Sequence, residues 1–313
     1  MGTLLFAAPR DAGEAVLALG AFAHLHARHA GAIVLCAPDA TALFRAHGNV
    51  GIIEAQGLSP WLGLAWRSLG KPFDVLADFS ASPGAYAVPA RRRVVRRASK
   101  ILRHLVEDFS ELAGAEAPLA PRITLDERAR LDARAAVSET GPLLALAPGA
   151  AHAGARWPAE RFAAVARRLV SGAGPLAGAR IVILGVETER DLGRELAGSL
   201  DADGVSAVSL AGRLDLLASA ALLERATLFI GNDGPLTHVA AAMNIASLGL
   251  YGPSDERMRG PYGARARALR GRPFSDIMAE AHGALTSRSW VEDVSVDAVE
   301  EAADALMRAG GLG

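Results

Sequence analysis

The feature that most constrains the fold is an alternation of short apolar runs with longer segments of helical periodicity, in both halves of the 313-residue chain. The apolar runs predict strands at 3–8, 32–36, 51–54, 75–78, 143–146, 181–184, 228–230 and 247–251. The other segments predict helices at 15–28, 40–47, 61–69, 100–113, 125–137, 159–170, 188–200, 214–224, 236–243 and 296–308. Strands that alternate with helices are typical of parallel sheets, so we expect an α/β protein with doubly wound sheets.

A change in composition divides this alternation into two series. Residues 115–122 are rich in proline and alanine, a charged helical segment follows, and Gly141-Pro142 precedes the second series. We therefore expect an N-terminal domain over 1–140 and a C-terminal domain over 141–313. Because open parallel sheets bind ligands beyond the carboxyl ends of their strands, two such domains predict a cleft between them, with functional residues just after strands.

The composition excludes several classes of protein. Lysine and arginine number 33 and the acidic residues 34, so the net charge of −1 argues against nucleic acid as a partner. The single cysteine, Cys36, excludes a disulfide framework or a multi-cysteine metal site and fits a reducing cytoplasm. The first residues lack the features of a secretory signal, and no apolar run reaches about 18 residues, so we expect a cytoplasmic protein, at most peripheral on the inner membrane.

The most specific motif is the run GNDGPLTHVAAA, residues 231–242, directly after a predicted strand. Pro235 suits the first position of a helix, whose free amides would attract a phosphate. Asp233 and His238 would then point at a ligand, one accepting from a sugar hydroxyl and the other donating to a phosphate. Equally, Asp233 merely caps the helix and His238 is an ordinary first-turn residue; the run alone leaves both readings open.

A second candidate site is the loop of small residues at 148–158, which contains Gly149, Ala150 and Arg156. Small side chains let the backbone approach a pyrophosphate closely, and Arg156 can add a charge-assisted contact. Ordinary turn chemistry accounts for the same loop.

A third candidate follows the first predicted strand, where Arg10 and two carboxylates, Asp11 and Glu14, lie together in the sequence. A carboxylate there can act as a general base whose pKa is set by the arginine. The alternative is that both acids are favourable first-turn residues of the next helix.

The strongest charge run comprises Arg91 to Arg97 and Lys100. Such a run is either a solvated face or a docking site for an anionic acceptor or lipid head groups, with Arg92, Arg93 and Arg96 as the contacts. The histidines lack metal-ligand spacing, and we expect no metal site.

Several motifs together resemble glycosyltransferase family 9, whose best-known members are ADP-heptose:lipopolysaccharide heptosyltransferases. The resemblance covers nearly the whole chain. The residues that carry it are 231–242, 251–255, 260–263, 148–150 with 156–158, Leu184-Gly185 leading to Glu189-Arg190, 73–78 and Gly13-Glu14.

This resemblance implies a GT-B fold of two Rossmann-like domains, acceptor on the N-terminal one and nucleotide-sugar on the C-terminal one. It implies an inverting, metal-independent transfer without a cofactor, from ADP-heptose or a related donor to an anionic glycolipid acceptor of the lipopolysaccharide core. By the same resemblance Glu14 is the base, with Asp11 as the second candidate, and Glu189 holds the nucleoside or ribose. The resemblance also implies that the phosphates are bound by the segment that contains Asn232, Asp233, Gly234, Thr237 and His238.

The chain departs from the family pattern at three positions: Glu14 replaces the usual aspartate, Ala155 stands at the diphosphate lysine beside Arg156, and Gly234-Pro235 replaces the usual Thr-Gly or Ser-Gly. These departures keep a second reading open, a catalytically silent GT-B protein that binds a nucleotide or glycan. A nicotinamide oxidoreductase is disfavoured, because no strand is followed by Gly-x-Gly-x-x-Gly.

Overall fold

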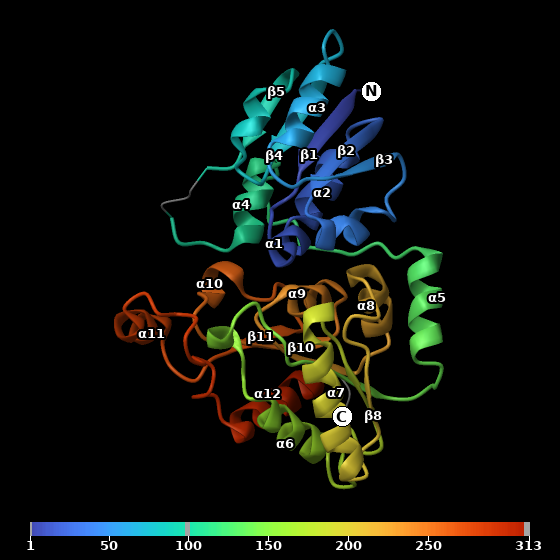
Figure 1. Cartoon of the computed structure of the whole chain (residues 1–313), viewed down its shortest axis with the longest axis vertical. Coiled ribbons are helices and arrows are strands. Elements are labelled where there is room, and N and C mark those ends of the chain that lie inside the picture. Colours follow the sequence, from blue (N-terminus) through green and yellow to red (C-terminus); the bar gives the residue numbers. More distant parts are fainter. Residues whose placement is uncertain (1, 98–100, 310–313) are drawn as a thin grey trace. The chain divides into compact units, whose positions relative to one another are not determined.

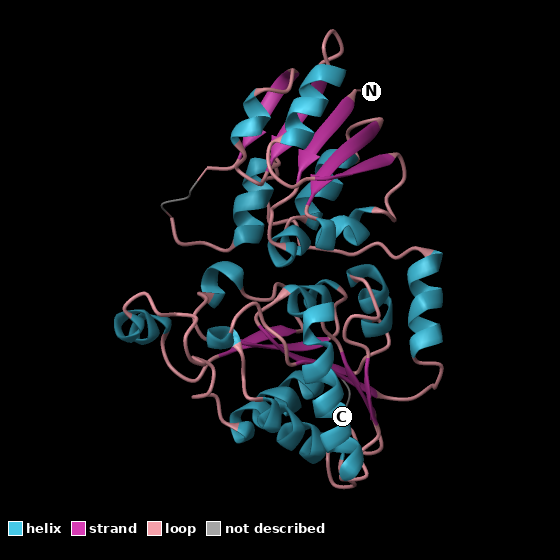
Figure 2. Cartoon of the chain, in the orientation of Figure 1, coloured by secondary structure: helices cyan, strands magenta, loops and turns pink. Residues whose placement is uncertain are grey.

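The computed structural model describes residues 2–97 and 101–309, in two compact units, Met1–Asp126 and Glu127–Gly313. Each unit has a parallel sheet with helices on its two faces (Figures 1 and 2). This confirms the expected α/β class with doubly wound sheets.

Unit 1 has a five-stranded sheet in the order β3-β2-β1-β4-β5. The strands are β1 (Thr3–Ala7), β2 (Gly31–Cys36), β3 (Val50–Glu54), β4 (Phe73–Asp78) and β5 (Ala90–Val95). The helices are α1 (Ala12–Leu17), α2 (Leu19–His26), α3 (Ser59–Arg67) and α4 (Leu105–Leu112), with the 3-10 helices η1 (Pro38–Phe44) and η2 (Pro83–Tyr86).

Side chains of β1 alternate between two apolar layers, as the pleat of a strand requires. Phe6 lies in an aromatic cluster, with ring centroids 5.1 Å from Phe22 of α2 and 5.0 Å from Phe79, which in turn stacks on Phe109 of α4. Leu5, on the other face, packs in the layer that holds Trp61 of α3. Both faces of the sheet are therefore covered, which explains why its central strands read as continuous apolar runs.

Unit 2 has a six-stranded sheet in the order β11-β10-β9-β6-β7-β8. The strands are β6 (Leu143–Ala147), β7 (Arg180–Ile183), β8 (Ala207–Ser209), β9 (Leu228–Asn232), β10 (Ala246–Leu250) and β11 (Ala266–Leu269). The helices are α5 (Glu127–Ala136), η3 (Ala153–Ala155), α6 (Ala159–Val170), η4 (Glu187–Glu189), α7 (Arg190–Ala202), α8 (Leu216–Leu223), α9 (Pro235–Ala242), α10 (Glu256–Arg259), α11 (Phe274–Ala281) and α12 (Val296–Ala309).

The helices of unit 2 form two layers. Helices α6, α7 and α12 pack together on one face, and α8 and α9 cover the other with α5 outside them. Helix α5 packs on α8 and belongs to unit 2, so the chain divides between Asp126 and Glu127, whereas the sequence predicts a boundary at residue 140.

Several elements differ from the sequence-based expectation. The helix expected at 15–28 starts at Ala12 and is interrupted at Ala18, and the one expected at 100–113 begins at Leu105. Lys100 lies outside the described residues. Strands β5, β8 and β11 and helix α11 were not expected, because their polar or short segments carry little periodic signal.

The strand orders locate where ligands would bind. In each sheet the chain first adds strands on one side of the unit's first strand and then adds the remaining strands on its other side. The switch point therefore lies between β1 and β4 in unit 1 and between β6 and β9 in unit 2. Ligands of such sheets bind beyond the carboxyl ends of the strands at this point. In unit 2 the loop after β6 and the start of α9 lie there, and in unit 1 the segments after β1 and β4.

Candidate functional site

Asn232, the last residue of β9, holds the loop after β6 in place. Its side chain accepts from the Trp157 amide (3.0 Å) and donates to the carbonyls of Pro148 (2.8 Å) and Gly149 (3.3 Å). Only 2% of Asn232 is exposed. Because the side-chain amide is bonded to backbone groups, we interpret Asn232 as a residue that positions the candidate site.

Glu189 and Gly149 lie against each other, although 40 residues apart in the sequence. A Cβ on Gly149 would come within 1.9 Å of the Glu189 carboxyl carbon, and one on Gly185 within 2.7 Å of Oε2 of Glu189. The same Oε2 accepts from the Val186 amide at 2.9 Å. Two glycines therefore let this half-buried carboxylate approach the backbone after both β6 and β7.

Helix α9 begins at Pro235, as its sequence predicts, after Gly234 in extended backbone. Thr237 is fully buried and donates to the Asn232 carbonyl at 2.6 Å, which fastens the first turn to β9. His238 is buried as well, and its Nε2 lies 3.9 Å from the Asp233 carboxylate. The structure thus brings Asp233 and His238 together at the start of α9.

Tyr251, directly after β10, is a buried neighbour of Asp233 and was not among the predicted site residues. Its hydroxyl donates to the Arg259 carbonyl at 3.1 Å. Burial, and secondly the charge of Asp233 and a hydrogen bond to it, raise the pKa of Tyr251 well above its usual value. Tyr251 therefore stays protonated and neutral.

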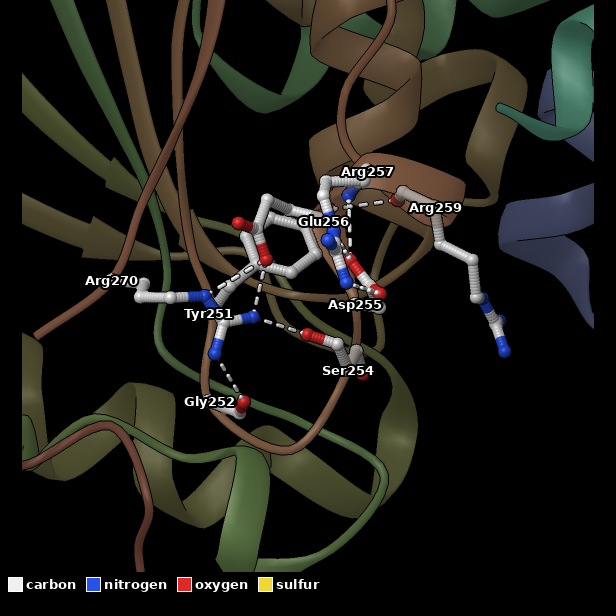
Figure 3. Close-up of polar contacts among 8 residues, drawn as sticks. All are labelled: Tyr251, Gly252, Ser254, Asp255, Glu256, Arg257, Arg259 and Arg270. Carbon is white, nitrogen blue, oxygen red and sulfur yellow. Dashed lines mark hydrogen bonds and ion pairs between the residues drawn. The ribbon is translucent and has the colours of Figure 1, made fainter. Parts of the chain in front are cut away.

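Arg270 holds together the loop between β10 and α10 (Figure 3). Its guanidinium donates to the Gly252 carbonyl (2.9 Å), to the Ser254 carbonyl and to the Glu256 carboxylate (2.8 Å from Nε). In the same loop Asp255 caps α10, and the hydrogen bond from the Arg257 side chain lowers the pKa of Asp255. Residues 251–255, which carry part of the family resemblance, are thus held in place by contacts within unit 2.

Arg156 and Ala150 meet across the loop after β6. The Arg156 side chain is exposed, and its Nη2 lies 3.4 Å from the Ala150 carbonyl. Ala155 beside it is 5% exposed, because the 3-10 turn η3 faces inward. Of the two neighbours, only Arg156 presents its side chain to solvent at this loop.

In unit 1, Asp11 and Glu14 lie at the start of α1, where a hydrogen bond between them stabilises the end of the helix. Asp11 is the N-cap and accepts from the Glu14 amide at 2.9 Å. The Glu14 carboxylate accepts from Nη1 of Arg96 at 2.7 Å, and Arg96 also lies over the Phe109 ring, 5.0 Å from its centroid. The structure therefore joins Glu14 to Arg96, which the sequence analysis had placed in separate motifs.

Asp78, at the carboxyl end of β4, is a fully buried acid that sequence reasoning missed. It accepts from the amides of Ser80 (2.9 Å) and Ser82 (2.7 Å) and from the Ser80 hydroxyl (2.6 Å). Burial raises the pKa of Asp78, while these bonds and the charge of Arg10 oppose the rise. Its position as the last residue of a strand, with serines two and four residues further on, was the available signal.

Most of the arginine run lies in the edge strand β5, and its side chains differ in what they contact. Arg93 donates to the carbonyls of Ala85 (3.0 Å) and Val88 (2.6 Å), which ties β5 to η2. Arg92 is exposed, and Arg91 lies 3.2 Å from Asp74. Only part of the run is thus presented to solvent.

Among residues 2–97 and 101–309, no three His, Cys, Asp or Glu side chains are grouped so that they could hold a metal ion. In that same part of the chain no helix is both long and apolar enough to cross a membrane.

The two sheets, each in Rossmann strand order with its loops at the switch point, define a protein of the GT-B fold class. The model of glycosyltransferase family 9 (heptosyltransferase) matches residues 67–278, and the chain belongs to this family.

Among characterised relatives, lipopolysaccharide heptosyltransferase 2 of Escherichia coli (strain K12) is 30% identical over 136 residues, which cover 43% of this chain and 38% of that protein. The match therefore spans less than half of the relative's length. Among solved structures, E. coli ADP-heptose lps heptosyltransferase II has a TM-score of 0.79 at 20% identity, over 99% of both chains. E. coli heptosyltransferase WaaC with ADP has a TM-score of 0.70 at 16% identity, over 97% of this chain and 99% of that one. These structures share the fold.

Proposed function

We propose that this chain is an inverting, metal-independent glycosyltransferase that moves a heptose or a related sugar from a nucleotide-sugar, with ADP-heptose as the expected donor, to a lipopolysaccharide core acceptor. The observation that carries the proposal is the meeting of three segments at the switch point of unit 2. These are the Gly149 backbone after β6, the Glu189 carboxylate after β7 and the start of α9 after β9. The family membership and the ADP in the WaaC structure support the same donor class.

Each part of this donor site has a physical role in the proposal. The Glu189 carboxylate accepts from ribose hydroxyls, and the small residues at 149–150 let the diphosphate approach the backbone. The amides that open α9 and the exposed Arg156 stabilise the negative charge on the leaving diphosphate. These groups supply the stabilisation without a metal ion.

In unit 1, Glu14 is the proposed general base, and the reaction is a single displacement. The Glu14 carboxylate takes the proton of the acceptor hydroxyl, the hydroxyl oxygen bonds to the anomeric carbon, and the bond from that carbon to the diphosphate breaks. Arg96 holds the Glu14 carboxylate in position before the acceptor arrives. Asp11 acts through its cap on α1, so Asp11→Asn should change turnover less than Glu14→Gln, because asparagine is also a good N-cap.

The acceptor is proposed to be an anionic glycolipid on unit 1, with the protein peripheral on the cytoplasmic side of the inner membrane. Of the three arginines in the proposal, Arg92 is exposed, Arg96 neighbours the proposed base, and Arg93 is held by backbone carbonyls. Arg92→Ser should therefore weaken acceptor binding, whereas Arg93→Ser should destabilise η2 and β5.

Ligand-dependent thermal unfolding with ADP, UDP and GDP, followed by turnover assays with the matching sugar nucleotides, tests the donor. A ligand that binds the native state raises its stability in proportion to the logarithm of its excess over Kd. We expect ADP to give the largest shift, and Asp233→Ala and His238→Ala to reduce this shift and turnover. Turnover should persist in EDTA. A preference for UDP, or activity restored only by Mg²⁺ or Mn²⁺, would contradict the donor or the metal independence respectively.

A second candidate is a catalytically silent binding protein of the same fold. Two observations favour it: Glu14 is bound to Arg96, and a buried alanine, Ala155, stands where the family has its diphosphate lysine. Nucleotide binding without transfer to any heptose-accepting glycolipid would support this candidate over the enzyme.

A further inference from the structure

Helix α3 of unit 1 carries apolar side chains on both of its faces. Trp61 and Leu64 are buried against the sheet, as expected for a crossover helix. On the opposite face Leu62 and Trp66 are 64% and 78% exposed, and Leu58 and Leu69 beyond the helix ends are 53% and 62% exposed. A soluble helix normally turns polar residues to water on its outer face, so these side chains need an explanation.

The outward side chains form one continuous stripe. Leu58, Leu62 and Trp66 follow each other at four-residue spacing, which places them on one side of a helix, about 12 Å along its axis at 1.5 Å per residue. Tyr86 of η2, which packs against α3, is 63% exposed as well. We call these five residues, including Leu69, the α3 stripe.

The charge next to the α3 stripe is positive. Residues 55–73 contain Arg67 and Lys71, both exposed, and no aspartate or glutamate. Lys71 lies where the chain enters β4, beside the start of β5, since Phe73 pairs with Ala90. In Figure 1 this turn lies at the same end of unit 1 as the start of β5, which adds the exposed Arg92. Two acids flank this segment in the sequence: Glu54, which is exposed, and Asp74, which is engaged by Arg91 and by the Thr3 amide.

We propose that the α3 stripe docks on the surface of a bilayer that contains anionic phospholipid. Leucine and tryptophan side chains insert at the interface, and Arg67 and Lys71 lie among the acidic head groups. The nine-residue helix is far shorter than the roughly 20 residues of a membrane span, so it lies in the plane of the interface. The inference rests on the proposed function, in which the acceptor is a lipid, and it specifies the surface that meets the membrane.

Co-sedimentation with vesicles tests the docking. Wild-type protein should bind vesicles of phosphatidylcholine with phosphatidylglycerol at least tenfold more tightly than vesicles of phosphatidylcholine alone. The double variant Leu62→Ser, Trp66→Ser should lose at least tenfold in affinity for the mixed vesicles. Leu131→Ser is the matched control, because Leu131 is a 57% exposed leucine on α5 of unit 2, and it should bind as the wild type does. Arg67→Gln with Lys71→Gln should remove most of the preference for anionic lipid and its salt sensitivity.

Tryptophan fluorescence gives an independent readout. Trp66 is exposed, whereas Trp61, Trp157 and Trp290 are 3%, 0% and 4% exposed. Binding of mixed vesicles should therefore shift the emission to shorter wavelength through Trp66, and lipids brominated on their acyl chains should quench it. Trp66→Phe should abolish the shift while the protein still sediments with the vesicles.

Three results would overturn the inference: no binding of wild-type protein to mixed vesicles, an equal loss in the Leu131→Ser control, or a concentration-dependent dimer that the double variant dissolves. The last result would assign the stripe to an interface between two copies of the chain. Unchanged thermal unfolding of the variants establishes that they are folded. Transfer to a lipid-free acceptor fragment separates the two proposals, because it fails if the proposed function is wrong but persists if only the docking surface is wrong.

Discussion

Replacement of Asn232 by alanine distinguishes a residue that positions the site from one that binds the donor. The side-chain amide bridges β9 to a loop 75 to 84 residues away, through the Trp157 amide and the carbonyls of Pro148 and Gly149. Alanine removes all three bonds and leaves the buried Trp157 N–H without its acceptor. We therefore expect loss of stability and of donor affinity together.

The magnitude follows from the contacts. The bond to the Pro148 carbonyl, at 2.8 Å, contributes about 0.5–1.5 kcal/mol net, and loss of the 3.0 Å bond leaves the buried Trp157 backbone donor unsatisfied, which costs about 1–3 kcal/mol. With the weaker bond at 3.3 Å neglected, the free energy of unfolding of unit 2 should fall by about 1.5–4.5 kcal/mol for Asn232→Ala. Asn232→Asp, of the same shape, should lose at least as much, because its carboxylate would face two carbonyl oxygens.

Urea unfolding followed by far-ultraviolet circular dichroism measures the stability, and calorimetric titration with ADP measures the donor affinity. Gly198→Ala in α7 serves as the control for handling and expression, since its Cβ would enter open space. Wild-type stability combined with lost ADP affinity in Asn232→Ala would mean that the amide contacts the donor itself. The positioning role would then be refuted.

Four further predictions concern single residues. Gly149→Ala should weaken ADP binding about tenfold, while the free energy of unfolding falls by less than about 2 kcal/mol because the new Cβ displaces only the end of the Glu189 side chain. Gly198→Ala should raise the free energy of unfolding by up to about 1 kcal/mol in the same assay. Glu14→Gln should lower turnover by about 10²–10⁴-fold with ADP affinity unchanged in calorimetry, and full turnover would place the base elsewhere. Burial first, then Glu54 and Asp39, raises the pKa of Cys36 to about 12, so a thiol reagent at mildly alkaline pH should label it only after denaturation. Because the unfolded thiol ionises near its usual pKa of about 8.5, stability should fall as the pH rises beyond that value; labelling of the native protein would show that the thiol is accessible.

The sequence by itself determined the fold class and most of the elements. The apolar runs of β1, β2, β6 and β9 are visible because strands covered on both faces contain few polar residues. Proline at the first position of α9 predicted its start correctly, since that preference depends on the local backbone alone. The candidate loops after β6 and β9 were also predictable, because they follow strands.

Only the tertiary structure decided how the candidate residues are used. Asn232 and Thr237 belonged to a predicted phosphate segment, yet their side chains hold backbone groups. Glu14 and Arg96 are 82 residues apart in sequence and share an ion pair, and Glu189 reaches Gly149 across a neighbouring strand. Periodicity and caps report on interactions within a few residues, whereas these contacts depend on strand order and register, which bring distant segments to the same edge of a sheet.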